Sequence, residues 1–211
     1  VVLDSKMSLL EILSDLLDVF ETPPIDDFPP LHGGLVGYLG YDIVREIENL
    51  PHAPTDDKHL PDAKLSVIGD LIAIDHWKQR AFLISNILIT DEGSEISLEE
   101  KYQNAISRLE DLADKGAVGS EEPLMFPPPF DEDLPEAIST FQTDQFCLAV
   151  EAAKEHIIDG DIFQVVLSQR FDVQLDADPF DVYRVLRQIN PSPYMYFFRY
   201  EDFTIVGASP E

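Results

Sequence analysis

The sequence has 211 residues, of which 41 are acidic and 14 are lysine or arginine, so the formal net charge at pH 7 is −27. Because 45% of the residues are hydrophobic, the chain can bury a core and is not an acidic disordered tail. A surface this negative repels phosphate backbones and anionic lipids, which argues against a nucleic-acid or membrane partner. The acidic residues are spread along the chain, as is typical of a solvated surface.

The single cysteine, Cys147, excludes an intramolecular disulfide and a cysteine-rich metal cluster. It lies in the apolar run 146–150, so we expect a small buried side chain rather than a nucleophile. The five histidines include no pair spaced to place two ligands on one helix face, so no metal site is expected within this chain. The sequence has no stretch of membrane-spanning length and no signal-peptide pattern, which predicts a cytoplasmic protein.

The first half of the chain predicts two helices and several strands. Ser8 and Glu11 have the spacing of a capping box and open a helix that ends before Pro23. The glycine-rich run 31–42 lacks the spacing of a phosphate-binding loop and is typical of strands packed against another backbone. The remaining predictions here are strands at 65–68, 71–75 and 81–89, and a helix that begins after Ser97 and ends at Gly116.

The second half begins with a proline-rich and acidic stretch, 119–141, which is the best candidate for a linker between domains. Thr143 is predicted to cap a helix that ends at Gly160, and a strand is predicted at 162–171. Alternation along that strand puts four side chains on one face, which is either a solvent face or the polar floor of a binding site: Gln164, Val166, Ser168 and Arg170.

After this strand, Asp178-Pro179 opens a helix that ends near Asn190, because Pro191 follows. Strand-like runs at 194–199 and 203–207 flank a short polar turn and predict a hairpin. Helices and strands are mixed without regular alternation. The predicted fold is therefore α+β with largely antiparallel sheets and packed helices.

Three segments, followed by a short motif at the end of the chain, resemble the large subunit of anthranilate synthase, a chorismate-utilising enzyme. The segments are 33–42 (GGLVGYLGYD), 160–171 (GDIFQVVLSQRF) and 190–195 (NPSPYM), and the last motif is 207–211 (GASPE). The resemblance implies that 1–138 is part of an N-terminal regulatory domain, with a linker at about 119–141. Residues 139–211 would then begin the chorismate-binding catalytic domain.

The same resemblance implies a reaction and two catalytic residues. Ammonia from a glutamine amidotransferase subunit attacks chorismate, and the products are anthranilate and pyruvate. The reaction requires Mg²⁺ and is a step of tryptophan biosynthesis. Gln164 lies where water-using relatives such as isochorismate synthase have a lysine, and a neutral amide can bind and position ammonia without taking a proton. Glu211 matches the glutamate proposed as general acid for the leaving C4 oxygen.

Pro193, Tyr194 and Met195 match part of the feedback site for tryptophan, where they offer apolar and sulfur contacts to an indole ring. The other half of that site, a Leu-Leu-Glu-Ser element, is absent from this chain. The chain begins at Val1 and stops at Glu211 after an apolar run, so we expect a segment of a longer protein. The Mg²⁺ ligands are expected downstream of Glu211, and the 211 residues alone are expected to be inactive.

Two alternatives remain open at this point. The large subunit of aminodeoxychorismate synthase, in the folate pathway, shares the ammonia chemistry and a glutamine at the position of Gln164. A non-catalytic module for amino-acid sensing or subunit docking would use the same residues without turnover.

Overall fold

The computed structural model describes residues 7–89, 96–129, 131 and 135–210. They form two compact units, Val1–Glu121 and Glu122–Glu211, and each unit is described by itself. The division falls inside the proline-rich stretch 119–141. The assignment of a regulatory and a catalytic domain to the two parts of the chain stays a prediction.

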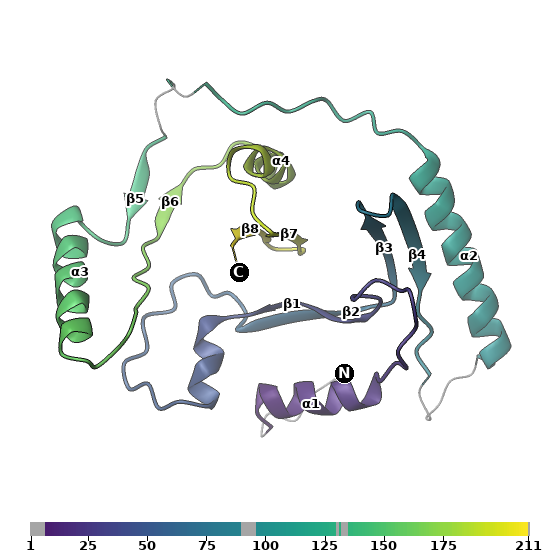
Figure 1. The fold of residues 1–211 in the computed structure, drawn as a ribbon, viewed down its shortest axis with the longest axis horizontal. Coiled ribbons are helices and arrows are strands. Elements are labelled where there is room, and N and C mark those ends of the chain that lie inside the picture. Colours follow the sequence, from purple (N-terminus) through teal and green to yellow (C-terminus); the bar gives the residue numbers. More distant parts are fainter. Residues whose placement is uncertain (1–6, 90–95, 130, 132–134, 211) are drawn as a thin grey trace. The chain divides into compact units, whose positions relative to one another are not determined.

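The four sheets that the described residues form are all two-stranded and antiparallel, so the predicted α+β class is confirmed. The first unit contains most of the elements expected for it (Figure 1). In chain order they are helix α1 (Leu9–Val19), strand β1 (Gly34–Leu39), the 3₁₀ helix η1 (Tyr41–Glu46), strands β2 (Ala63–Ile68), β3 (Asp70–Asp75) and β4 (Arg80–Ser85), and helix α2 (Leu98–Ala117).

Helix α1 begins at the predicted capping box. The Ser8 hydroxyl accepts from the Glu11 backbone N–H at 3.1 Å, and the Glu11 carboxylate accepts from the Ser8 N–H at 3.0 Å. The carboxylate of Glu46, from η1, accepts from the N–H groups of Leu9 at 2.9 Å and Leu10 at 3.2 Å. The first-turn donors of α1 are thus paired, and a negative charge lies at the positive end of the helix dipole.

Strands β1 and β2 approach closely at Gly37, as the glycine-rich run predicted. Gly37 lies opposite Leu65 in the register of the two strands. A methyl group on Gly37 would collide with the carbonyl oxygen of Lys64 and lie 2.9 Å from the Cα of Leu65. The glycine therefore serves backbone packing.

Helix α2 lies beside β4 and is joined to the β3–β4 hairpin by Arg108 (Figure 1). The Arg108 Nε lies 3.0 Å from Asp70 Oδ2, and its Nη2 donates to Ser85 Oγ at 2.9 Å. The Ser85 hydroxyl donates to Asp70 Oδ1 at 2.6 Å. The pKa of Asp70 lies below its ordinary value, and the hydrogen bond from the Ser85 hydroxyl is the largest cause. Partial burial raises this pKa, and the hydrogen bond and charge of Arg108 lower it.

Replacing Asp70 with asparagine should make the stability of the first unit less sensitive to acid. The folded-state pKa of Asp70 lies below the ordinary value of 3.8, so its stabilisation is present above pH 3.8 and is lost as the pH falls through the lowered pKa. At neutral pH we expect Asp70→Asn to lower the free energy of unfolding by about 1 kcal/mol, because the pair is partly exposed. Urea denaturation at neutral and acidic pH measures both effects. The control is Asp111→Asn on the exposed side of α2, and equal acid sensitivity in wild type and Asp70→Asn would contradict the prediction.

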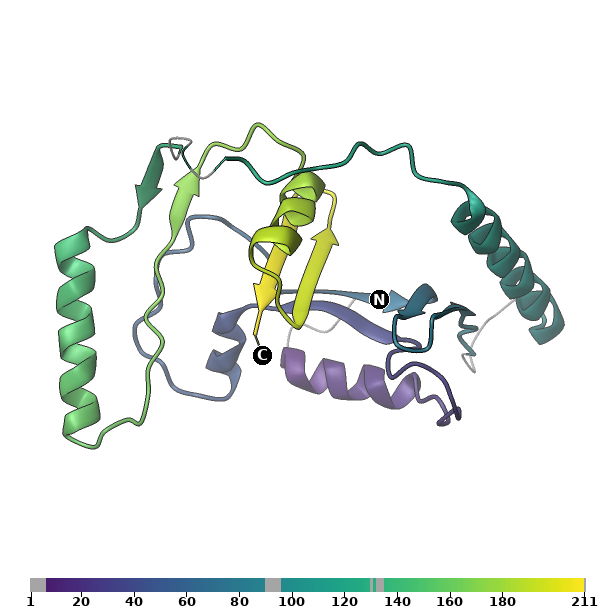
Figure 2. The same ribbon diagram turned by 45° about the horizontal axis from the view of Figure 1, so that its top comes forward.

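The second unit contains a short sheet, two helices and a hairpin. Helix α4 is capped by Asp178, whose side chain accepts from the Phe180 N–H at 2.7 Å, and Pro179 is the first helical residue, as predicted. Figure 2 shows α4 beside the hairpin that follows it. The elements are β5 (Ala137–Ser139), α3 (Thr143–Ile158), β6 (Phe171–Val173), α4 (Pro179–Ile189), β7 (Tyr194–Arg199) and β8 (Thr204–Ser209).

Three predictions for this unit are wrong. The strand at 162–171 does not form: only Phe171–Val173 pairs, with β5. A strand needs a continuous ladder with a neighbour, and among the described segments the contact of Arg170 with Thr140 does not extend to the residues before it. Helix α3 is capped by Gln142, and Thr143 is already its first helical residue. Cys147 lies exposed on α3 rather than buried.

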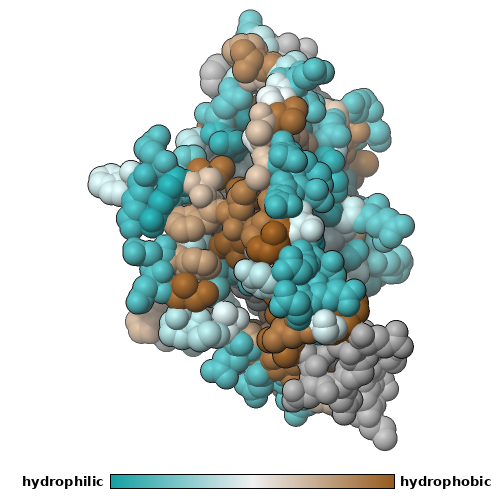
Figure 3. All heavy atoms as spheres, turned by 90° about the vertical axis from the view of Figure 1, so that its right-hand side faces the viewer, coloured by the Kyte–Doolittle hydropathy of each residue, from teal (hydrophilic) through white to brown (hydrophobic). Residues whose placement is uncertain are grey.

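Few apolar side chains of the described residues are buried: only Ile12, Ile84 and Ala105 are less than a tenth exposed, at 8%, 7% and 4%. Many large apolar side chains are exposed instead. On the face drawn in Figure 3, hydrophobic patches lie between hydrophilic residues. Patches of this kind mark surfaces that contact another segment or protein. Within the described ranges, no helix is long and apolar enough to cross a membrane.

Candidate functional site

Gln164 lies in an irregular segment between α3 and β6 whose first end is fixed by a helix-ending turn. Gly160 has φ +83°, and its N–H donates to the Ile157 carbonyl at 3.2 Å. The N–H of Asp161 donates to the His156 carbonyl at 3.0 Å, which completes a Schellman motif. The His156 Nδ1 also lies 2.8 Å from the Asp161 carboxylate. The predicted end of the helix at Gly160 is thus confirmed.

The other end of this segment is held against β5. The Thr140 N–H donates to the Arg170 carbonyl at 3.0 Å, and the Arg170 N–H donates to the Thr140 hydroxyl at 3.1 Å. The side-chain amide of Gln169 donates to the hydroxyl of Ser139. Gln164 lies exposed between these two anchors. Its amide oxygen and amino group are therefore open to a ligand.

The expected tryptophan-binding residues lie at the open end of the β7–β8 hairpin. Tyr194 is 61% exposed and Met195 is half-buried, while Pro193 precedes the strand and is exposed. In the antiparallel register Tyr194 lies opposite Ser209 and Met195 opposite Ala208. The structure therefore joins two separately predicted motifs, 190–195 and 207–211, at one end of one hairpin.

Glu211, the expected acid, lies outside the described residues and follows Ser209 by two positions in the chain. Gln164 belongs to the separate segment between α3 and β6. The catalytic roles of both residues, and the tryptophan site at 193–195, therefore stay predictions.

Sequence reasoning missed contacts made by Ser192 and by helix α4. The Ser192 hydroxyl donates to the carbonyl oxygen of Ser209. On α4, the Arg184 guanidinium donates to the Pro123 carbonyl, and the Gln188 amide donates to the Met125 carbonyl at 3.0 Å. Only Ser192 has a signal in the sequence, because it stands between two prolines that restrict its backbone.

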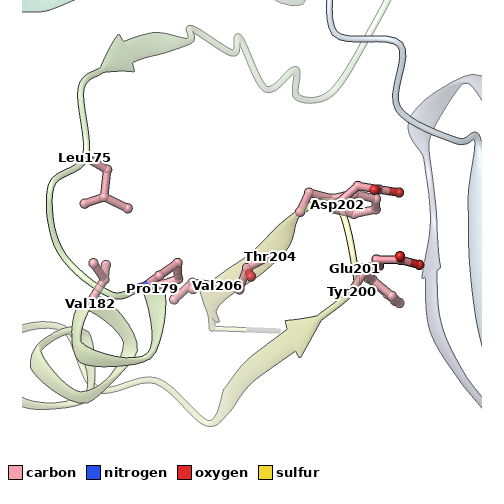
Figure 4. Close-up of a pocket in the computed structure, with 9 residues that line it drawn as sticks. Leu175, Pro179, Val182, Tyr200, Glu201, Asp202, Thr204 and Val206 are labelled. Carbon is pink, nitrogen blue, oxygen red and sulfur yellow. The ribbon is translucent and has the colours of Figure 1, made fainter.

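A hollow of about 510 Å³ lies at the other end of the hairpin, beside α4 (Figure 4). The carboxylates of Glu201 and Asp202 point away from Leu175 and Val182 in this view. No lysine or arginine is among the residues that line it, so the hollow does not suit a dianion. The lining residues are Leu175, Pro179, Val182, Tyr200, Glu201, Asp202, Phe203, Thr204 and Val206.

Three arginines of the second unit have acidic partners, which limits the positive field that they offer to an anion. The nitrogen-to-oxygen distances in these ion pairs are 3.4, 2.9 and 3.2 Å, for Arg170 with Asp172, Arg184 with Asp181, and Arg199 with Asp178. In the part of the chain that the structure describes, no group of three or more His, Cys, Asp and Glu side chains is arranged to hold a metal ion. The described His, Cys, Asp and Glu side chains therefore do not fit a magnesium site, and no step of the reaction is assigned to a metal bound by them.

Residues 6–211 match the family model described as chorismate binding enzyme. Anthranilate synthase component 1 of Acetivibrio thermocellus is 36% identical over 207 residues, which cover 96% of this chain and 40% of that protein. The same component of Geobacillus stearothermophilus is 40% identical over 197 residues, covering 89% of this chain and 38% of that protein. A crystal structure of anthranilate synthase component I from Streptococcus pneumoniae matches with a TM-score of 0.67 and 32% identity, covering 94% of this chain and 43% of the other.

The chain thus spans about 40% of the length of these relatives. The matched region includes the anchored segment around Gln164 and the hairpin that joins motifs 190–195 and 207–211. Because the family model covers nearly every residue, the chain belongs to the chorismate binding enzyme family.

Proposed function

We propose that the chain acts in the large subunit of an anthranilate synthase, a lyase that converts chorismate and ammonia to anthranilate and pyruvate for tryptophan biosynthesis. The observation that carries this proposal is the exposed amide of Gln164 on a segment held at both ends. The similarity to anthranilate synthase components of two bacteria over most of the chain supports it.

In the proposed reaction Gln164 positions ammonia. A neutral amide offers an acceptor oxygen and two N–H donors, but it does not take a proton at neutral pH. It therefore suits ammonia, which already carries a lone pair, better than water, which needs a general base. The nitrogen bonds to C2 of chorismate while the C4–oxygen bond breaks. Glu211 gives the departing hydroxyl a proton, so that it leaves as water, and the new ammonium group loses a proton to solvent. Pyruvate is eliminated in a second step.

The charge of the substrate must be balanced outside the described part of the chain. Chorismate is a dianion, while the chain has a formal charge of −27 and three arginines of the second unit are paired with acidic residues. We propose that Mg²⁺ and further cationic side chains, from segments downstream of Glu211, supply the positive field. The 211 residues alone are then inactive.

A glutamine amidotransferase subunit is proposed as the source of ammonia, and tryptophan as a feedback inhibitor that binds along Pro193, Tyr194 and Met195. The exposed ring of Tyr194 and the half-buried Met195 offer apolar and sulfur contacts to an indole. A tryptophan titration of the full-length enzyme tests the assignment, and uninhibited turnover would remove it.

The two alternatives have less support. The relatives reported above are anthranilate synthase components, which does not favour an aminodeoxychorismate synthase. A non-catalytic sensing module would bind tryptophan with these 211 residues alone. We expect calorimetry on the 211-residue chain to detect little or no binding, because half of the feedback site is absent from the sequence.

Replacing Gln164 with lysine in the full-length protein tests the proposed function directly. The charged lysine has no acceptor atom for an N–H of ammonia, so ammonia should no longer be held in place. Misplacement of a reacting group by about 1 Å costs roughly 100-fold in rate. We therefore expect anthranilate formation from chorismate and ammonium to fall by about that factor. Gln174→Lys, at an exposed glutamine after β6, is the matched control and should retain activity. Wild-type turnover in Gln164→Lys would show that Gln164 does not position the nucleophile.

A further inference from the structure

Ser192 has little backbone freedom, because it lies between Pro191 and Pro193. Each proline fixes its own φ near −65°, and the residue before a proline is restricted to extended conformations. The short loop from α4 to β7 therefore holds the backbone of Ser192 and its Cα–Cβ bond in a narrow range of directions, and the bond to the Ser209 carbonyl orients the hydroxyl. A residue held in this way can position a neighbouring group at little further entropic cost.

The Ser192 hydroxyl lies at the open end of the β7–β8 ladder. It donates its hydrogen to the carbonyl oxygen of Ser209, and it lies 3.4 Å from the carbonyl oxygen of Tyr194. Tyr194 and Ser209 are the last opposed pair of the two strands. The side chain of Ser192 is half-buried, so water competes less for this bond than it would at a fully exposed site.

The position of the Ser209 backbone matters because the proposed acid follows it closely. Only Pro210 separates Ser209 from Glu211 in the sequence. Successive Cα atoms are about 3.8 Å apart and proline has a fixed φ, so few rotations lie between the end of β8 and Glu211. A shift of the Ser209 carbonyl therefore moves the point from which Pro210 continues the chain.

We propose that Ser192 is a positioning residue for the reaction. Its hydroxyl fixes the position of the Ser209 carbonyl. The chain continues from there through Pro210 to Glu211, whose carboxyl group is proposed to protonate the leaving oxygen of chorismate. This inference rests on the proposed function, in which Glu211 is the general acid. It assigns Ser192 a role through Glu211 and no contact with the substrate.

The test compares Ser192→Ala and Ser192→Thr in the full-length protein, with chorismate and ammonium as substrates. Loss of one hydrogen bond is worth about 1 kcal/mol, so we expect kcat to fall about fivefold in Ser192→Ala, with the KM for chorismate unchanged. Threonine keeps the hydroxyl and an extended backbone, and should restore kcat. Thr204→Val removes a hydroxyl at the opposite end of the same hairpin and is the matched control, which should keep wild-type kcat.

A double-mutant cycle with Glu211→Gln separates this inference from the proposed function. If Ser192 acts through Glu211, Ser192→Ala should cause no further loss of kcat once Glu211 is glutamine. An equal loss in both backgrounds would overturn the positioning role. So would a Ser192→Thr variant with normal circular dichroism and the low kcat of Ser192→Ala. Full turnover in Glu211→Gln alone would instead refute the proposed acid.

Discussion

Replacing Glu211 with glutamine should lower the turnover of the full-length protein by about 10²- to 10⁴-fold, the range typical of a lost general acid. The glutamine side chain has the same shape but cannot donate a proton to the departing C4 oxygen. Ground-state binding of chorismate depends on other groups, so its KM should change little. Steady-state rates of anthranilate formation at saturating ammonium measure both parameters.

Glu201→Gln is the matched control for this substitution. Glu201 lies exposed in the turn of the same hairpin, at the end away from Ser209. It removes one negative charge from the same unit, so it also tests whether the overall charge of −27 affects the rate. A Glu211→Gln variant that is no slower than Glu201→Gln would exclude Glu211 as the acid.

The helices could be predicted because their ends are fixed by neighbouring residues. The capping box of Ser8 and Glu11, the Asp178 cap and the Gly160 turn each depend on residues within a few positions of one another. The second carboxylate at the start of α1, Glu46, lies 37 positions from Leu9 and has no local signal. Local chemistry thus determines where a helix begins, and distant contacts add to its stability.

The strands depend on partners that the sequence does not identify. The segment before Phe171 has the composition of a strand but forms no ladder, because its described hydrogen bonds at Gln169 and Arg170 run to Ser139 and Thr140 through side chains as well as backbone. The prediction that Cys147 is buried was wrong for the same reason, because a side chain is buried only where another element covers it. Apolar composition alone does not supply one.

The register of strands β7 and β8 at the candidate site also could not be predicted from the sequence. A turn of three residues, 200–202, would place Tyr194 opposite Ala208. The observed turn includes Phe203, because the Tyr200 N–H donates to the Phe203 carbonyl at 2.9 Å and the two rings lie 4.9 Å apart. This one-residue difference puts Ser209 opposite Tyr194, within reach of the Ser192 hydroxyl. The resemblance identified the motifs, but only the register shows which of their residues meet.

The largest effect on folding is expected from Gly37→Ala in the β1–β2 pair. The added methyl group would collide with the carbonyl oxygen of Lys64, and a backbone atom cannot rotate away as a side chain can. The two strands must separate, and overpacking of this kind costs about 1–3 kcal/mol. We expect the midpoint of urea denaturation, followed by circular dichroism, to fall accordingly.

Gly69→Ala distinguishes this collision from a general intolerance of substitution at glycine. Gly69 lies between β2 and β3, and a methyl group there would meet no atom within 4 Å. Because alanine also reduces the freedom of the unfolded chain, Gly69→Ala should leave stability unchanged or raise it by up to about 1 kcal/mol. If both variants lost the same stability, the close approach at Gly37 would not explain the glycine. If only Gly37→Ala is destabilised, glycine in the motif 33–42 is required there by the contact between two strands.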